Sequence, residues 1–176
     1  MSAGQDSPAS PKRRWFLKTA VAIGVVGGAL GGGMWWNRGF DKGRLTPAGE
    51  KVFRGVARGV LAQMLPAGVE RDRILNEHMQ DLERLYNNLP SAKRDQINLV
   101  ASLLANAPTR YLAVGLWTSW DEASDEQIQQ VLRSMQMSEH LVPNVLFSAV
   151  RALTTLCFFS QPTHWNLTGY PGPMSI

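Results

Sequence analysis

The most constraining feature of this sequence is the spacing of apolar residues after Leu45, which recur every three to four positions instead of every second position. Such a period places them on one side of an α-helix, whereas a half-buried strand alternates apolar and polar residues. This part of the chain contains no run of alternating Val, Ile or Thr and no Asn-Gly or Asp-Gly turn. The sequence therefore predicts an all-α fold.

Caps and prolines set the expected helix boundaries. Thr46 and Pro47 form a favourable N-cap and first-position pair, and Pro66 stops the helix that they open. The acidic turn from Trp120 to Asp125 places negative charge at the start of a later helix, where the helix dipole favours it. The predicted helices span about 47–65, 70–88, 91–105 capped by Ser91, 109–117, 124–137 capped by Ser124, and 143–160.

The helix predicted for about 143–160 is the most apolar, and we expect it to be the central helix of a small bundle-like domain. It contains Arg151 and about 18 residues, which favours a core helix over a membrane span. The first helix instead carries Gly49, Gly55 and Gly59, each of which costs about 1 kcal/mol of helix propensity relative to Ala. Because no strand precedes these glycines, they predict close helix contacts and not a catalytic turn.

Charge is distributed unevenly along the 176 residues. The chain has 18 Lys and Arg and 14 Asp and Glu, a formal net charge of +4. Five of the basic residues and one acidic residue lie within 1–40, so the remaining 13 basic residues are balanced by 13 acidic ones. The body therefore shows no net attraction for a phosphate backbone, and nucleic acid is not expected as a partner.

Few residues suggest chemistry of their own. Cys157, the single cysteine, excludes an intrachain disulfide and a c-type haem site, and it is expected to be a small buried apolar residue. His78 is expected in the core, His140 at a helix junction, and His164 beside Trp165 at an interface. No metal-ligand spacing links the three histidines, and no phosphate-binding or nucleophile motif is present. A self-contained enzyme would draw its site from these histidines and from Asp121 and Glu122.

The N-terminal segment resembles an export signal. Residues 1–11 are polar and rich in Ser and Pro, a basic cluster follows, and a Gly- and Ala-rich apolar stretch comes next. This order is similar to that of a twin-arginine (Tat) signal, in which an arginine pair and one further residue precede Phe-Leu-Lys. Lys12 stands where Ser or Thr is usual. The matching residues are Arg13, Arg14, Phe16, Leu17 and Lys18.

The same segment leaves two outcomes open. No small-x-small cleavage site follows the apolar stretch, and residues 20–36 are 17 residues long, about the lower limit for crossing a bilayer core of about 30 Å. Trp35 and Trp36 suit a membrane interface, with Arg38 just beyond. The signal is therefore either removed after export or retained as an inner-membrane anchor.

The C-terminal tail, residues 161–176, is rich in Pro and Gly and also carries aromatic residues. This composition predicts an extended segment and not a helix. Aromatic residues on an extended Pro-rich segment are typical interface anchors. The tail either folds back over the helices or docks on another subunit, and the expected partner-binding residues are Trp165, Tyr170, Pro171 and Pro173.

Short sequence motifs at the two ends of the body resemble those of a known family. Met64-Leu65-Pro66 closes the first helix, Phe158-Phe159-Ser160-Gln161-Pro162 precedes Trp165, and Gly169 to Pro173 reads Gly-Tyr-Pro-Gly-Pro. Through these motifs, residues 45–173 resemble the gluconate 2-dehydrogenase small-subunit family. The resemblance implies an accessory subunit of a large FAD-dependent dehydrogenase of the glucose–methanol–choline type, with a cytochrome c subunit as electron acceptor. It implies no catalytic residue and no cofactor in this chain, with FAD held by the partner.

These observations predict three segments: a Tat signal or anchor helix at 1–40, a helical domain at 41–160, and a tail at 161–176. The expected role is a non-catalytic periplasmic subunit that escorts and stabilises its large partner through the Tat translocon, because Tat carries folded cargo. A self-contained periplasmic enzyme or small-ligand-binding helical protein, and a membrane-tethered structural protein, are the alternatives.

Overall fold

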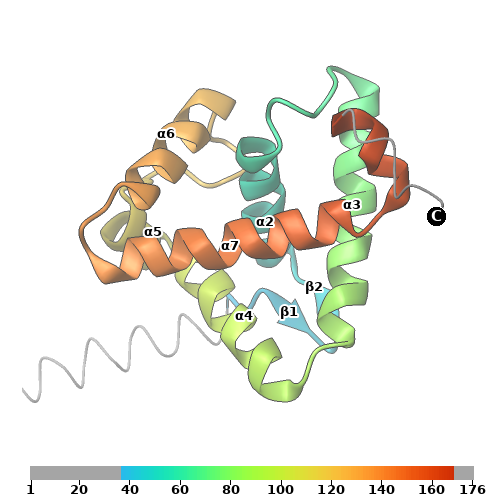
Figure 1. Cartoon of the computed structure of the whole chain (residues 1–176). Coiled ribbons are helices and arrows are strands. Elements are labelled where there is room, and N and C mark those ends of the chain that lie inside the picture. Colours follow the sequence, from blue (N-terminus) through green and yellow to red (C-terminus); the bar gives the residue numbers. More distant parts are fainter. Residues whose placement is uncertain (1–36, 169–176) are drawn as a thin grey trace, which may run out of the picture. The chain divides into compact units, whose positions relative to one another are not determined.

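The computed structural model describes residues 37–168, which are mostly helical, as the sequence predicts. Residues 1–36 of the expected signal segment (1–40) and residues 169–176 of the expected tail (161–176) lie outside the described part. Figure 1 shows the arrangement of the elements. In chain order they are β1 (Phe40–Asp41), β2 (Arg44–Leu45), α2 (Pro47–Val60), α3 (Val69–Asn87), α4 (Ser91–Ala105), α5 (Ala107–Val114), α6 (Asp125–Gln136), α7 (Leu141–Phe159) and the 3-10 helix η1 (Pro162–Thr168).

Most helix boundaries agree with the caps seen in the sequence. The Thr46 side chain accepts a hydrogen bond from the Gly49 N–H, and Ser124 forms a capping box with Gln127. Several expectations were inaccurate. Helix α2 ends at Val60, six residues before Pro66, which was expected to stop it. Pro90, and not Ser91, is the N-cap of α4, and α5 ends at Val114 because Gly115 takes a left-handed conformation with φ of 74°.

The central helix of the described part is α2, which packs against α3, α4, α6 and α7. The prediction that the last helix is central was wrong. Helix α7 crosses α2 and contacts α3 and α6 with one face only, as Figure 1 shows. Within this apolar helix, Val145 and Leu156 are 52% and 62% exposed, while Leu146, Val150 and Phe158 are buried.

Glycines on α2 explain how its neighbours approach so closely. A Cβ atom at Gly55 would lie 2.9 Å from the Cβ of Trp120, and one at Gly59 would lie 2.6 Å from Ile128 and Leu132. At Gly49 it would meet the Gly39 carbonyl oxygen at 2.0 Å. The prediction of close contacts is therefore confirmed, and small residues let α6 and the loop before it reach the α2 backbone.

A short antiparallel hairpin precedes α2 and was not predicted. Phe40 pairs with Leu45, and the two-residue turn Lys42-Gly43 has φ of 47° and 82°. Two positive φ values are typical of the two-residue hairpin turn that Asn-Gly or Asp-Gly usually indicates. Because this turn has the sequence Lys-Gly, the sequence pattern did not predict it. The Phe40 ring stacks on Tyr86 at a centroid distance of 3.9 Å, which fixes the hairpin to α3.

The first part of the tail is not extended. Pro162–Thr168 form a 3-10 helix, in contrast to the sequence prediction. The last carbonyls of α7 provide the reason, because a ring nitrogen of His164 lies 3.0 Å from the Phe158 oxygen and the Trp165 indole donates to the Phe159 oxygen. These contacts fold the start of the tail back onto the end of α7.

Candidate functional site

The outward side of α7 is an apolar surface that the described residues leave uncovered. Its residues repeat at alternating intervals of three and four, and all are exposed or half-buried. We call them the outer stripe: Val142, Val145, Ala149, Ala152, Leu156 and Phe159. Soluble monomers seldom leave a contiguous apolar strip of this kind open to water, so the stripe is a candidate interaction surface.

A groove runs beside the second half of this stripe. We call it the α7 groove; it has a volume of about 450 Å³ and is formed by α3, α4 and α7 over Phe53 of α2. Of the described residues that line it, only Lys93 and Gln96 are polar, and the others are apolar. Its apolar lining residues are Phe53, Leu85, Leu89, Ile97, Val100, Ala149, Val150, Ala152, Leu153 and Leu156. A concave apolar surface of this size accommodates apolar side chains of a ligand or partner.

A second exposed apolar region lies around α5. Leu112 and Trp117 are 79% and 73% exposed, and the Trp117 ring meets Tyr111 edge-on with centroids 5.2 Å apart. Arg110 holds this region together, because its buried guanidinium donates to the carbonyls of Ala105, Leu116 and Trp117. Burial lowers the pKa of Arg110. Arg110 therefore joins the chain on both sides of α5, while Leu112 and Trp117 face outward.

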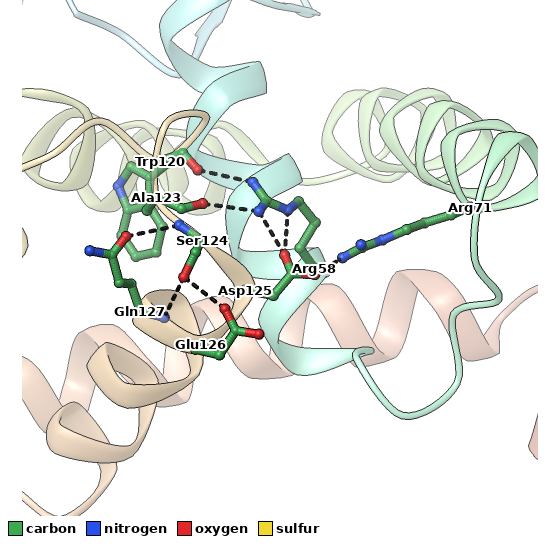
Figure 2. A network of polar contacts seen from close by, with 8 residues as sticks. All are labelled: Arg58, Arg71, Trp120, Ala123, Ser124, Asp125, Glu126 and Gln127. Atoms are coloured by element: carbon green, nitrogen blue, oxygen red, sulfur yellow. Dashed lines mark hydrogen bonds and ion pairs between the residues drawn. The ribbon is translucent and has the colours of Figure 1, made fainter.

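The acidic turn before α6 contributes to a polar network that holds neighbouring elements together (Figure 2). Asp125 accepts hydrogen bonds from Arg58 and Arg71 at 2.6 Å, and Arg58 also donates to the carbonyls of Ala123 and Trp120. Burial alone would raise the pKa of Asp125, but the hydrogen bonds from Arg71 and Arg58 outweigh it and the pKa is lowered. The network joins α2, α3 and α6, as Figure 2 shows.

The remaining acidic candidates do not gather into a site. Asp121 forms an exposed ion pair with Lys51 at 2.9 Å, and Glu122 is exposed next to it. Both carboxylates precede the N-cap Ser124, and the acidic residues in the first turn of α6 are Asp125 and Glu126. Among residues 37–168, no group of three or more His, Cys, Asp or Glu side chains could hold a metal ion.

The structure brings two of the three histidines together at the corner of α3, α7 and η1. His78 is 1% exposed and His164 is 4% exposed, and His164 stacks on the Phe158 ring at 4.2 Å. Burial, and to a smaller extent the nearby His164, lowers the pKa of His78 to about 4. His78 is a core residue as predicted, but its Nδ1 has no hydrogen-bond partner among the described residues.

Cys157 lies next to this pair and is buried, as expected. Its Sγ is 3.9 Å from the His78 carbonyl oxygen, and burial raises the pKa of the thiol to about 12. A thiol with such a pKa stays protonated at neutral pH and is a poor nucleophile. His140 is exposed at the other end of α7, where it is the N-cap residue without a side-chain capping bond. No nucleophile and base are therefore paired here.

The structure places only one of the expected partner-binding residues. Trp165 is half-buried, and its indole N–H donates to the Phe159 oxygen at 2.9 Å. Tyr170, Pro171 and Pro173 lie outside the described residues. The same holds for the expected export residues Arg13, Arg14, Phe16, Leu17 and Lys18.

Comparisons with known proteins leave the family open. No family model matches the chain, and neither a curated protein nor a solved structure matches it. The family resemblance carried by the two ends of the body therefore stays an expectation.

Proposed function

We propose that this chain is a non-catalytic small subunit that binds a larger exported protein and escorts it through the Tat pathway. The observation that carries the proposal is the uncovered apolar surface of α7, with the groove beside it. An apolar helix face of this length is stabilised when a second protein removes it from water, at roughly 25 cal/mol per Å² of buried apolar surface. A partner is thus part of the chain's working state.

The distribution of polar groups supports an accessory role. Asp125, Arg58 and Arg110 are engaged in holding loops and helices, and Cys157 is a buried protonated thiol. The two buried histidines stack on or lie near Phe158 inside the core. These groups stabilise the fold, so chemistry is assigned to the partner.

The sequence supplies the route and the class of partner. The Arg13-Arg14 pair with Phe16, Leu17 and Lys18 is the export address, and the resemblance of residues 45–173 names an FAD-dependent dehydrogenase of the glucose–methanol–choline type as cargo. The complex is then periplasmic and passes electrons to a cytochrome c subunit. FAD belongs to the large subunit, and this chain holds no cofactor.

Expression of the tagged full chain from its native locus tests the proposal. The periplasmic fraction should yield a yellow complex much heavier than 19.5 kDa, with a flavin absorbance spectrum and a large subunit identified by mass spectrometry. Replacing both Arg13 and Arg14 by Lys should leave both proteins in the cytoplasm. Arg38→Lys, a matched change outside the motif, should not.

Two results would contradict this role. A colourless chain that elutes alone from the periplasm would exclude the large subunit as its partner. A large subunit that still reaches the periplasm with the double Lys variant would exclude escort by this signal. Substrate turnover by the isolated chain would instead favour the self-contained enzyme.

A further inference from the structure

The outer stripe of α7 has the geometry of a helix-pairing surface. Its intervals from Val142 to Phe159 are three, four, three, four and three residues, the 3.5-residue average of a coiled-coil seam. A helix that packs at a small angle keeps such a seam in contact along its whole length. The stripe therefore matches an α-helix better than a strand or an irregular loop.

The α7 groove adds depth where the stripe has its smallest residues. Ala149 and Ala152 line the groove, while Leu85 and Ile97 stand along it from α3 and α4. Small residues on one helix let the larger side chains of a second helix come close. The geometry favours bulky apolar residues on the partner helix opposite Ala149 and Ala152.

The charged residues beside the outer stripe are basic. Lys93 of α4 lines the α7 groove on one side of the stripe, and Arg151, the only charged residue of α7, lies on the other side, where it lines a separate groove with Phe147. The Arg151 guanidinium is 5.9 Å from the Phe147 ring centroid. Neither side chain forms an ion pair with a residue of the described part. Asp95, the acidic residue of α4, does not line the groove.

From these observations we infer that the α7 groove binds an amphipathic α-helix of the partner, with apolar residues at three- and four-residue spacing and acidic residues along the flanks. A second copy of this chain fits less well, because pairing two α7 helices would bring together two faces whose only charge is positive. A flat lipid surface does not fill a concave groove. The inference rests on the proposed function, since it names the part of the partner that is bound.

A synthetic peptide tests the groove directly. The full chain is titrated into a fluorescein-labelled helical peptide of about 18 residues with Leu at the three- and four-residue positions and Glu on the flanks. A matched peptide carries Lys in place of Glu. We expect fluorescence anisotropy to show binding of the Glu peptide on the order of tenfold tighter than binding of the Lys peptide.

Variants separate the groove from the rest of the apolar surface. Ala152→Glu places a negative charge at an exposed position of the groove and should weaken binding of the Glu peptide by about tenfold or more. Leu99→Glu makes the same change at an exposed apolar residue of α4 outside the groove and should leave affinity unchanged. Lys93→Glu should reduce the difference between the affinities for the Glu peptide and the Lys peptide. Circular dichroism confirms that each variant is folded.

Several results would overturn the inference: equal affinity for both peptides, no effect of Ala152→Glu, a dimer in sedimentation that Ala152→Glu dissociates, or binding of phosphatidylcholine vesicles without binding of either peptide. Failure of the groove is distinguishable from failure of the proposed function. If the large subunit co-purifies equally with the Ala152→Glu chain, only the groove assignment is wrong. If the Glu peptide binds the groove but no large subunit co-purifies, only the escort role is wrong.

Discussion

Acidification should destabilise this protein through His78. The buried imidazole has its pKa lowered from 6.5 to about 4 by burial and by the nearby His164. Between these two values the unfolded chain binds a proton at this position that the folded chain does not bind. The free energy of unfolding therefore falls as the pH falls from 6.5 towards 4, and this contribution becomes constant below 4.

The size of the effect follows from the two pKa values. Each pH unit in which only the unfolded chain binds the proton costs about 1.4 kcal/mol. Between pH 7 and pH 5, the unfolded chain alone carries this proton over roughly one and a half pH units, from 6.5 down to 5. His78 alone should therefore lower the free energy of unfolding by about 2 kcal/mol. This is a large part of the margin of a small domain, which is about 5–15 kcal/mol.

Urea unfolding of the full chain at pH 7, 6 and 5, followed by tryptophan fluorescence, measures this loss. His78→Leu removes the titrating group and the unpaired Nδ1 and keeps a similar side-chain volume. Between pH 7 and pH 5, the free energy of unfolding should therefore fall in the wild type by about 2 kcal/mol more than in His78→Leu. His140→Gln, at an exposed histidine, should behave as the wild type. Equal pH dependence in the wild type and His78→Leu would refute the reasoning.

Three further predictions concern the fold around α2 and α7. Gly55→Ala puts a methyl group 2.9 Å from the Trp120 Cβ and should lower stability by about 1–3 kcal/mol, seen as a lower thermal midpoint. Asp125→Asn removes the half-buried ion pairs to Arg58 and Arg71 and should cost about 1–2 kcal/mol at pH 7 in urea unfolding. Because the pKa of Asp125 is lowered in the fold, its contribution is present above pH 3.8 and disappears as the pH falls below that value. Cys157 should react with a disulfide reagent only when urea unfolds the chain, because the folded thiol is buried and protonated.

Matched changes test each of the three. Ser148→Ala on the exposed side of α7 should leave the midpoint near that of the wild type, and a similar midpoint for Gly55→Ala would show that α2 and Trp120 adjust without cost. Asp95→Asn, at an exposed carboxylate of α4, should change stability little, and an equal loss in both Asn variants would show that the Asp125 ion pairs add nothing. Fast modification of Cys157 in the absence of urea would show that the end of α7 opens readily.

Local sequence signals predicted the helices well where the physics is local. The Thr46 and Ser124 caps depend on residues a few positions apart, and the structure confirms them. The predicted stop at Pro66 is not confirmed, since α2 already ends at Val60. The close contacts at the α2 glycines are confirmed, but the residues that approach Gly55 and Gly59 come from a distant segment of the chain. The buried face of α3 with His78 was also predictable, since its apolar residues have one period and the opposite face is charged.

The errors come from features that a single segment does not contain. Helix α7 is apolar on nearly all sides, so hydropathy alone could not tell which side the other helices cover. The alternation of three and four residues from Val142 to Phe159 was the available signal for an outer stripe, but it does not reveal that the stripe stays uncovered. The fold of Pro162–Thr168 depends on the free carbonyls at the end of α7, which the tail sequence does not contain.

The sequence by itself determined that the body is helical and where most helices begin and end, because these properties depend on neighbouring residues. Only the tertiary structure decided that α2 is central, that His164 is buried near His78, and that α3, α4 and α7 leave an apolar groove. The physical reason is that burial and the pKa of a side chain depend on which distant segments pack against it. Which segments pack together depends on the sequence of the whole chain.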